Sequence, residues 1–166
     1  MRIDPTLSPT PETWLAANAP DEPVFIFHPG RLMEVAREFL TGFPGLVTYA
    51  VKANPAPEMI RVLHAAGITA FDVASPAEMA LVRAEAPGAI LHYHNPVRSA
   101  AEIVAGLETG CVSWSVDRMA ELEKLAGLPP GTEIAVRLKL PVAGAAYDFG
   151  AKFGATPEQA VQLLRR

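Results

Sequence analysis

Several absences exclude whole classes of protein. The 166 residues include one cysteine, Cys111, so neither an internal disulfide nor a thiolate zinc cage can form within the chain. Acidic residues outnumber basic ones by 18 to 14, so the sequence lacks the positive charge that binding of a nucleic-acid backbone requires. No apolar run approaches the roughly 20 residues of a membrane span, and residues 1–14 contain no apolar core of a signal peptide. We therefore expect a cytoplasmic protein without nucleic-acid or membrane partners.

The sequence also lacks both glycine-rich loops that bind phosphates in nucleotide-binding α/β proteins. It contains no G-x-G-x-x-G after its first apolar run and no G-x-x-x-x-G-K-[ST] anywhere. From Gly45 onward, an apolar strand, a turn and an amphipathic helix follow one another repeatedly. This alternation predicts an α/β fold with a parallel sheet. Without the nucleotide loops, a barrel is favoured over a doubly wound sheet.

The same patterns predict where each element begins and ends. Residues 1–23 are rich in proline and are expected to form a leader with at most a short helical turn near Trp14. Residues 24–44 are expected to form an opening strand and helix, and residues 45–166 a partial barrel. The predicted strands are 24–27, 46–51, 68–73, 89–92, 111–115 and 133–140, and the predicted helices are 31–39, 57–66, 76–84, 99–107, 117–125 and 156–164.

Side-chain caps support several of the predicted helix starts. A serine, threonine or aspartate before a helix accepts a hydrogen bond from an otherwise unpaired backbone N–H. A glutamate three residues later completes a capping box, which the sequence predicts for the first two of these positions. The predicted caps are Ser75, Ser99, Asp117 and Thr156, and the glutamates of the two boxes are Glu78 and Glu102.

Charged residues follow or close three of the predicted strands, where the working residues of barrel proteins lie. Lys52 ends an apolar run, and apolar surroundings disfavour its ammonium form, as a Schiff-base lysine requires. A lysine that extends from the strand end into solvent is the alternative. Asp72, near the end of the next strand, can pair with that lysine or cap the following helix. Arg137 is expected to face into the barrel as the partner of an anion, unless its strand is a solvent-exposed edge.

A pair of histidines and a glycine-containing loop are two further candidate functional features. His92 and His94 are two residues apart on one strand and therefore face the same side. No third ligand follows at a recognisable spacing, so we predict no metal, and we expect one histidine to be packed and the other to face the barrel mouth. Residues 147–154 form a glycine-punctuated loop that is too apolar for a plain linker, which suggests that it binds or docks another group.

Taken together, the strand-end motifs resemble the fold-type III pyridoxal-phosphate decarboxylases, from about Val24 to the end of the chain. Residues 95–98 and 141–154 are most similar to ornithine decarboxylase and its lysine/ornithine relatives. Diaminopimelate decarboxylase and the carboxynorspermidine enzyme share the first motifs and remain alternatives, and lysine or diaminopimelate is the alternative substrate. The motifs that carry the resemblance are Tyr49-Ala50-Val51-Lys52-Ala53-Asn54, Phe71-Asp72-Val73-Ala74-Ser75 with Glu78, Asn95-Pro96, Ser115-Val116-Asp117 with Glu121-Leu122, Val136-Arg137-Leu138 and Lys152-Phe153-Gly154.

The resemblance implies a cofactor and a role for each matching residue. The cofactor is pyridoxal 5′-phosphate (PLP), and Lys52 is the catalytic residue that holds it as a Schiff base. Ala50 is the small residue beneath the cofactor ring, and Asp72 is a carboxylate close to the cofactor that helps to position the lysine. Arg137 lies near the phenolic oxygen of the ring. The fold implied is the N-terminal part of an alanine racemase-like (β/α)8 barrel, with about five βα units present.

The family also implies supporting residues, a substrate and a partner. Glu78 is an acid behind the site, and Lys152 supports the partner's side of the site in the homodimer expected for the full-length enzyme. The reaction implied is decarboxylation of a basic amino acid, most closely L-ornithine to putrescine in polyamine biosynthesis.

The family's ring-stacking histidine, phosphate loop and C-terminal β domain are expected after residue 166. We therefore expect little or no decarboxylation by these 166 residues alone. A non-catalytic PLP-binding or regulatory module is the alternative of a different class.

Overall fold

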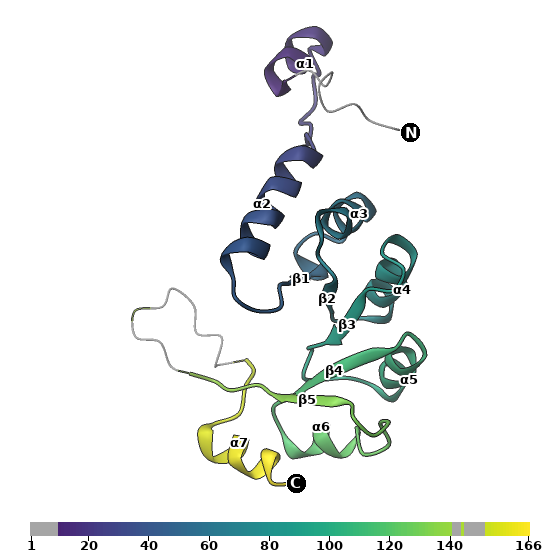
Figure 1. Cartoon of the computed structure of the whole chain (residues 1–166), viewed down its shortest axis with the longest axis vertical. Helices are drawn as coiled ribbons and strands as arrows, with labels where there is room; N and C mark the ends of the chain where they lie inside the picture. Colours follow the sequence, from purple (N-terminus) through teal and green to yellow (C-terminus); the bar gives the residue numbers. More distant parts are fainter. Residues whose placement is uncertain (1–9, 141–143, 145–151) are drawn as a thin grey trace.

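Five parallel strands form a single sheet whose order follows the sequence. Figure 1 shows the computed structural model, which describes residues 10–140, 144 and 152–166. Every strand pairs with the next one along the chain, in the order β1-β2-β3-β4-β5. The strands are β1 (Thr48–Ala50), β2 (Ala70–Val73), β3 (Ile90–Tyr93), β4 (Cys111–Val116) and β5 (Glu133–Val136).

Helices connect consecutive strands, so each crossover returns the chain to the same end of the sheet (Figure 1). This strict alternation confirms the predicted α/β class, and strand pairing in chain order is the arrangement expected for the N-terminal portion of a barrel. Proline lies in the first turn of five helices, where its missing N–H would have no intrahelical partner. The helices are α1 (Pro11–Asn18), α2 (Pro29–Gly42), α3 (Pro57–Ala66), α4 (Pro76–Glu85), α5 (Ala100–Glu108), α6 (Met119–Glu123) and α7 (Pro157–Leu164).

Within the part of the chain that the structure describes, no helix is both long and apolar enough to span a membrane.

The two faces of the sheet differ in polarity. One face packs against the connecting helices, and its largest side chains, including Phe71, Tyr93 and Trp114, are fully buried in the main apolar cluster. Successive strand residues point to opposite faces, so the intervening positions face away from these helices. Those positions form a mostly polar row in register across all five strands, made of Ala50, Asp72, His92, Ser113 and Glu133.

Several predictions at the N-terminal side are wrong, including the start of β1 at residue 46 and the bounds 31–39 for α2, which covers Pro29–Gly42. No strand forms at residues 24–27, because no described segment pairs with them and a strand requires a ladder partner; the side chain of Phe25 is fully exposed. β1 ends at Ala50 rather than at residue 51, because the chain turns into a 3-10 helix, η1 (Val51–Ala53). The helical segment around Trp14 is a full eight-residue helix rather than a short turn, and Thr10 caps it.

β5 is also shorter than predicted, because the chain changes partner after Val136. Ala155 donates its N–H to the carbonyl of Arg137 and accepts a hydrogen bond from the N–H of Lys139. Leu138 and Ala155 form an isolated parallel bridge. Residues 137–139 therefore hold the segment that precedes α7 instead of continuing β5.

Most predicted helix caps form as expected. The side chains of Ser75, Ser99 and Thr156 each accept a hydrogen bond from the N–H three residues later. Ser99 and Glu102 form the predicted capping box. A further box at Thr156 and Gln159 was not predicted, because that prediction considered only glutamate at the third position. Two predictions fail: Asp117 is not a helix cap, and Glu78 does not complete a capping box with Ser75. Their carboxylates accept hydrogen bonds from the N–H groups of Gly154 and Ala74 instead.

Gly106 provides a direct test of the packing between sheet and helices. It lies in α5, where an added Cβ would be 2.3 Å from Cη2 of the Trp114 indole. The fully buried ring would have to move, and overpacking of this kind costs about 1–3 kcal/mol. We expect Gly106→Ala to lower the free energy of unfolding, measured by urea denaturation, by that amount, although alanine favours helix formation.

Gly42→Ala is the matched control for this substitution. Gly42 is the last residue of α2, and an added Cβ there would contact nothing within 4 Å. We expect its stability to equal or slightly exceed that of the unaltered protein. Equal stability of the two variants would contradict the close contact between α5 and the indole.

Candidate active site

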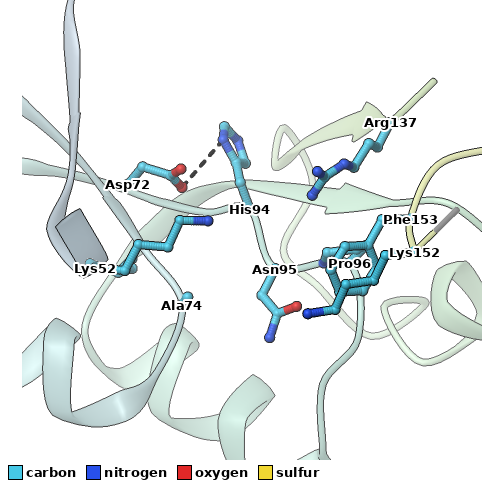
Figure 2. Close-up of a pocket in the computed structure, with 10 residues that line it drawn as sticks. Lys52, Asp72, Ala74, His94, Asn95, Pro96, Arg137, Lys152 and Phe153 are labelled. Atoms are coloured by element: carbon cyan, nitrogen blue, oxygen red, sulfur yellow. Dashed lines mark ion pairs between the residues drawn. The ribbon is translucent and has the colours of Figure 1, made fainter. Parts of the chain in front are cut away.

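A cavity of about 260 Å³ opens at the carboxyl edge of the sheet. Because the strands are parallel, the segments that follow β1, β2, β3 and β5 all meet there. Figure 2 shows the side chains that line the cavity converging from these segments. They include Lys52, Asp72, His94, Asn95, Arg137 and Lys152.

Lys52 lies in η1, two residues beyond the end of β1, rather than on a buried strand end. Val51 is buried beneath it, while the Lys52 side chain is exposed within the described chain and extends toward Asp72 (Figure 2). The expectation of an apolar environment for this lysine is therefore wrong, because the turn lifts it off the sheet. The Tyr49 hydroxyl donates a hydrogen bond of 3.3 Å to the carbonyl of Asn54 and so braces the turn.

Asp72 is the partly buried carboxyl of the cavity. Burial raises its pKa, while the positive charges of His94, Lys52 and His92 oppose that shift. Nδ1 of His94 lies 3.4 Å from Oδ1 of Asp72. This carboxyl therefore faces the amine of Lys52 on one side and an imidazole on the other (Figure 2).

His92, in β3, and His94, the residue directly after β3, both face the cavity side of the sheet. The expectation that one of them would be packed is therefore wrong. Their rings stack with centroids 5.3 Å apart, and each is half-buried. Burial lowers the pKa of His92. Nε2 of His94 lies 3.1 Å from Oγ of Ser113, whose hydroxyl donates to Glu133 over 3.0 Å. Among the described residues, no group of three or more potential ligands is arranged to hold a metal ion.

Two cations flank one aromatic ring at the opposite side of the cavity. Cζ of Arg137 and Nζ of Lys152 each lie 5.1 Å from the centre of the Phe153 ring. Arginine and lysine held over an aromatic face in this way keep their positive charges localised at the cavity wall. An anionic group of a ligand is therefore expected to bind on this side.

The segment that carries Lys152 and Phe153 is fixed by a buried carboxylate. Asp117 accepts a hydrogen bond of 3.0 Å from the N–H of Gly154 and one of 3.2 Å from Nε of Arg118. Its predicted role as a helix cap is wrong, because α6 begins at Met119 with Arg118 in the cap position. Gly154 has a φ of 106°, and an added Cβ would lie 2.7 Å from the backbone nitrogen of Lys139. Only glycine fits that close approach.

A second carboxylate supports the cavity from behind. Oε2 of Glu78 accepts a hydrogen bond of 2.7 Å from the N–H of Ala74, which lines the cavity. The predicted capping box at Ser75 does not form, because this carboxylate reaches past Ser75 to the residue before it. Glu78 therefore lies behind the cavity, on the first turn of α4.

Four of the six predicted site residues line the cavity, namely Lys52, Asp72, Arg137 and Lys152. Ala50 does not line it but is half-buried beside Asp72, its register partner in the sheet. The roles of His94 and Asp117 were not predicted, since neither their spacing nor their type distinguishes them from packed or capping residues. Residues 141–143 and 145–151, which include most of the predicted binding loop, lie outside the described part of the chain.

Solved structures of basic amino-acid decarboxylases share this fold. A lysine/ornithine decarboxylase of Vibrio vulnificus complexed with putrescine has 31% sequence identity and a TM-score of 0.71, over 82% of this chain and 36% of that one. Lysine decarboxylase of Selenomonas ruminantium has 27% identity and a TM-score of 0.79, over 96% of this chain and 42% of that one.

Curated relatives and a family model agree with these structural similarities. Lysine/ornithine decarboxylase of Selenomonas ruminantium is 36% identical over 72% of this chain, and ornithine decarboxylase of Leishmania donovani is 31% identical over 89%. The chain spans 30% and 21% of the lengths of these two relatives. Residues 30–166 match the model of the pyridoxal-binding domain of pyridoxal-dependent decarboxylases. The chain therefore belongs to the pyridoxal-dependent decarboxylases, and its residues 30–166 correspond to the N-terminal part of their pyridoxal-binding barrel.

Proposed function

We propose that this chain forms the cofactor-binding part of a PLP-dependent decarboxylase of a basic amino acid, with Lys52 as the cofactor lysine. The observation that carries the proposal is the meeting of Lys52, Asp72 and Arg137, from three separate strand ends, around one cavity. A lysine with a carboxylate beside it and a cation opposite supplies the groups that an aldehyde-bearing, anionic cofactor requires.

The residues present fit this cofactor in their chemistry. Lys52 supplies a primary amine for a covalent link, and Asp72 supplies a carboxyl beside that amine that can position it. Arg137 and Lys152 supply the positive wall for anionic oxygens. When bound, PLP provides the electron sink for the carbanion that loss of carbon dioxide leaves.

The remaining proposed roles concern support of the site. Ala50 leaves room beneath a ligand because a larger side chain beside Asp72 would extend from the same face of the sheet. Glu78 fixes the backbone at Ala74, and Lys152 is exposed at the rim of the cavity. We propose that Lys152 supports the partner's side of the site in a cytoplasmic homodimer.

L-ornithine, converted to putrescine in polyamine biosynthesis, is the substrate that we propose. The similarity of residues 95–98 to ornithine decarboxylase supports it, as does the ornithine activity named for two curated relatives. Lysine is the second candidate, because the relative at 36% identity is named for both amino acids. Turnover of ornithine, lysine and arginine by the protein expressed from its whole reading frame would rank the substrates.

The covalent link at Lys52 gives the first test of this proposal. The protein expressed from its whole reading frame is incubated with PLP, reduced with borohydride and digested, and the labelled peptide is identified by mass spectrometry. We expect the label on Lys52 and its loss in Lys52→Ala, because this amine lies in the cavity.

Lys139→Ala serves as the matched control, since Lys139 is also exposed but does not line the cavity. It should be labelled at Lys52 as in the unaltered protein. Label on Lys139, or an unchanged amount of label in Lys52→Ala, would refute the assignment.

Asp72 gives a second test, based on pH. Its raised pKa means that the folded state binds the carboxyl proton more tightly than the unfolded chain does. Above the folded pKa the folded protein bears the cost of a buried charge, and below the ordinary carboxyl value of about 4 both states are protonated and the cost is absent. Asp72→Asn should therefore raise Tm of the cofactor-free protein at pH 7 and lose this advantage as the pH falls toward 4.

Thermal unfolding at a series of pH values measures this difference. Asp21→Asn, at an exposed position, is the control and should leave Tm unchanged throughout. PLP affinity should fall in Asp72→Asn while Tm rises, which is typical of a residue kept for binding rather than for stability. A lower Tm of Asp72→Asn at pH 7 would show that the carboxylate is a net stabiliser.

A further inference from the structure

A line of polar contacts crosses the cavity face of the sheet and ends at Asp72. It runs from Glu133 on β5 to Ser113 on β4, then to His94 after β3, and from His94 to Asp72 on β2. The contacts measure 3.0, 3.1 and 3.4 Å in that order. The proposed function uses only Asp72 of this line, so the role of His94 needs its own explanation.

The line fixes which ring nitrogen of His94 carries a hydrogen. A serine hydroxyl has one hydrogen, and that of Ser113 is donated to the Glu133 carboxylate, which can only accept. Oγ of Ser113 must therefore accept in its contact with Nε2 of His94. Nε2 consequently bears a hydrogen whenever this arrangement is intact.

The other ring nitrogen then faces the carboxyl of Asp72. If Nδ1 bore only a lone pair and Asp72 were ionised, lone pair and negative charge would face each other at 3.4 Å. One proton between the two groups removes this repulsion, whether it resides on Nδ1 or on the carboxyl. The backbone N–H of His94 also interacts with the Asp72 carboxyl. Within the described part of the chain, the buried Oδ1 has no hydrogen-bond partner, so Nδ1 of His94 is the side-chain group placed to share a proton with it.

We propose that His94 is a positioning residue that retains a proton between its Nδ1 and Oδ1 of Asp72 and so fixes the carboxyl that faces Lys52. Ser113 and Glu133 orient the imidazole for this role. The inference rests on the proposed function, because it gives Asp72 its importance for the cofactor. The charged or titratable groups around the pair are Lys52, His92 and Glu133.

A packing role explains His94 less well. Its side chain is 34% exposed, and its ring contacts are with polar groups and with the neighbouring His92 ring rather than with the apolar cluster. The apolar cluster lies on the opposite face, where Tyr93 and Leu91 are buried. The two explanations predict different results for isosteric substitutions.

The first experiment records the ring nitrogen shifts of each histidine in the cofactor-free protein by NMR. We expect His94 to carry a hydrogen on Nε2, and Ser113→Ala to remove this preference. His64 provides an internal reference for the opposite tautomer, with the hydrogen on Nδ1. Its Nδ1 lies 3.2 Å from the carbonyl of Ile68, which can only accept a hydrogen bond. A His94 without a hydrogen on Nε2 would overturn the proposal, whatever the protein does with PLP.

The second experiment compares His94→Asn with His94→Gln in PLP affinity, measured by absorbance titration of the protein expressed from its whole reading frame. The asparagine amide nitrogen occupies the place of Nδ1 and always carries hydrogens, so it can donate to Asp72 without orientation by Ser113. The glutamine amide corresponds to Nε2 and reaches Ser113 instead. We expect about tenfold weaker PLP binding in His94→Gln, the size of one hydrogen bond to a charged group, and near-normal binding in His94→Asn.

Packing alone would reverse this order, because glutamine is closer to histidine in volume. Ser113→Ala as a single substitution should weaken PLP binding. Added to His94→Asn it should have no effect, because the asparagine amide does not need Ser113 to orient it. His64→Gln, at a histidine that does not line the cavity, should bind PLP normally. Tighter binding by His94→Gln than by His94→Asn would overturn the proposal, whereas absence of label at Lys52 in the unaltered protein would refute the proposed function instead.

Discussion

Parallel pairing of the five strands in chain order is the constraint on which the rest of the structure depends. It brings the residues that follow β1, β2, β3 and β5 to one edge, although Lys52 and Lys152 are distant in the sequence. It also forces one face of the sheet against the connecting helices and leaves the other face to polar side chains. The cavity and the polar line behind it both follow from this arrangement, because each consists of residues from several strands.

The polar face requires stabilisation that an apolar core does not. Two carboxylates stabilise it in the same manner, by accepting backbone N–H groups of segments at the cavity: Glu78 from Ala74 and Asp117 from Gly154. The carboxyl of Asp72 is the exception, since burial raises its pKa and its buried oxygen faces an imidazole. The site thus combines rigid backbone with one electrostatically costly group, a combination that is common where binding rather than stability determines the residue.

The sequence predicted those features that depend on local patterns, and it failed where a distant partner decides. Helix 57–66 was predicted with its observed bounds, because apolar periodicity, a first-turn proline and Gly67 all mark them. Residues 24–27 have the composition of a strand, but composition cannot supply the missing partner. Asp117 resembles a helix cap in sequence, and only the folded chain brings Gly154 within its reach. Lys52 was identified from its motif, whereas the turn that exposes it was not.

The central claim is that this edge of the sheet holds PLP through Lys52. A crystal structure of the protein grown with PLP tests it most directly. We expect continuous electron density from Nζ of Lys52 to the cofactor, with the Asp72 carboxyl beside it and an anionic oxygen toward Arg137. Density joined to another lysine, or a cofactor bound outside the cavity at the ends of β1, β2, β3 and β5, would contradict the assignment of Lys52 as the cofactor lysine.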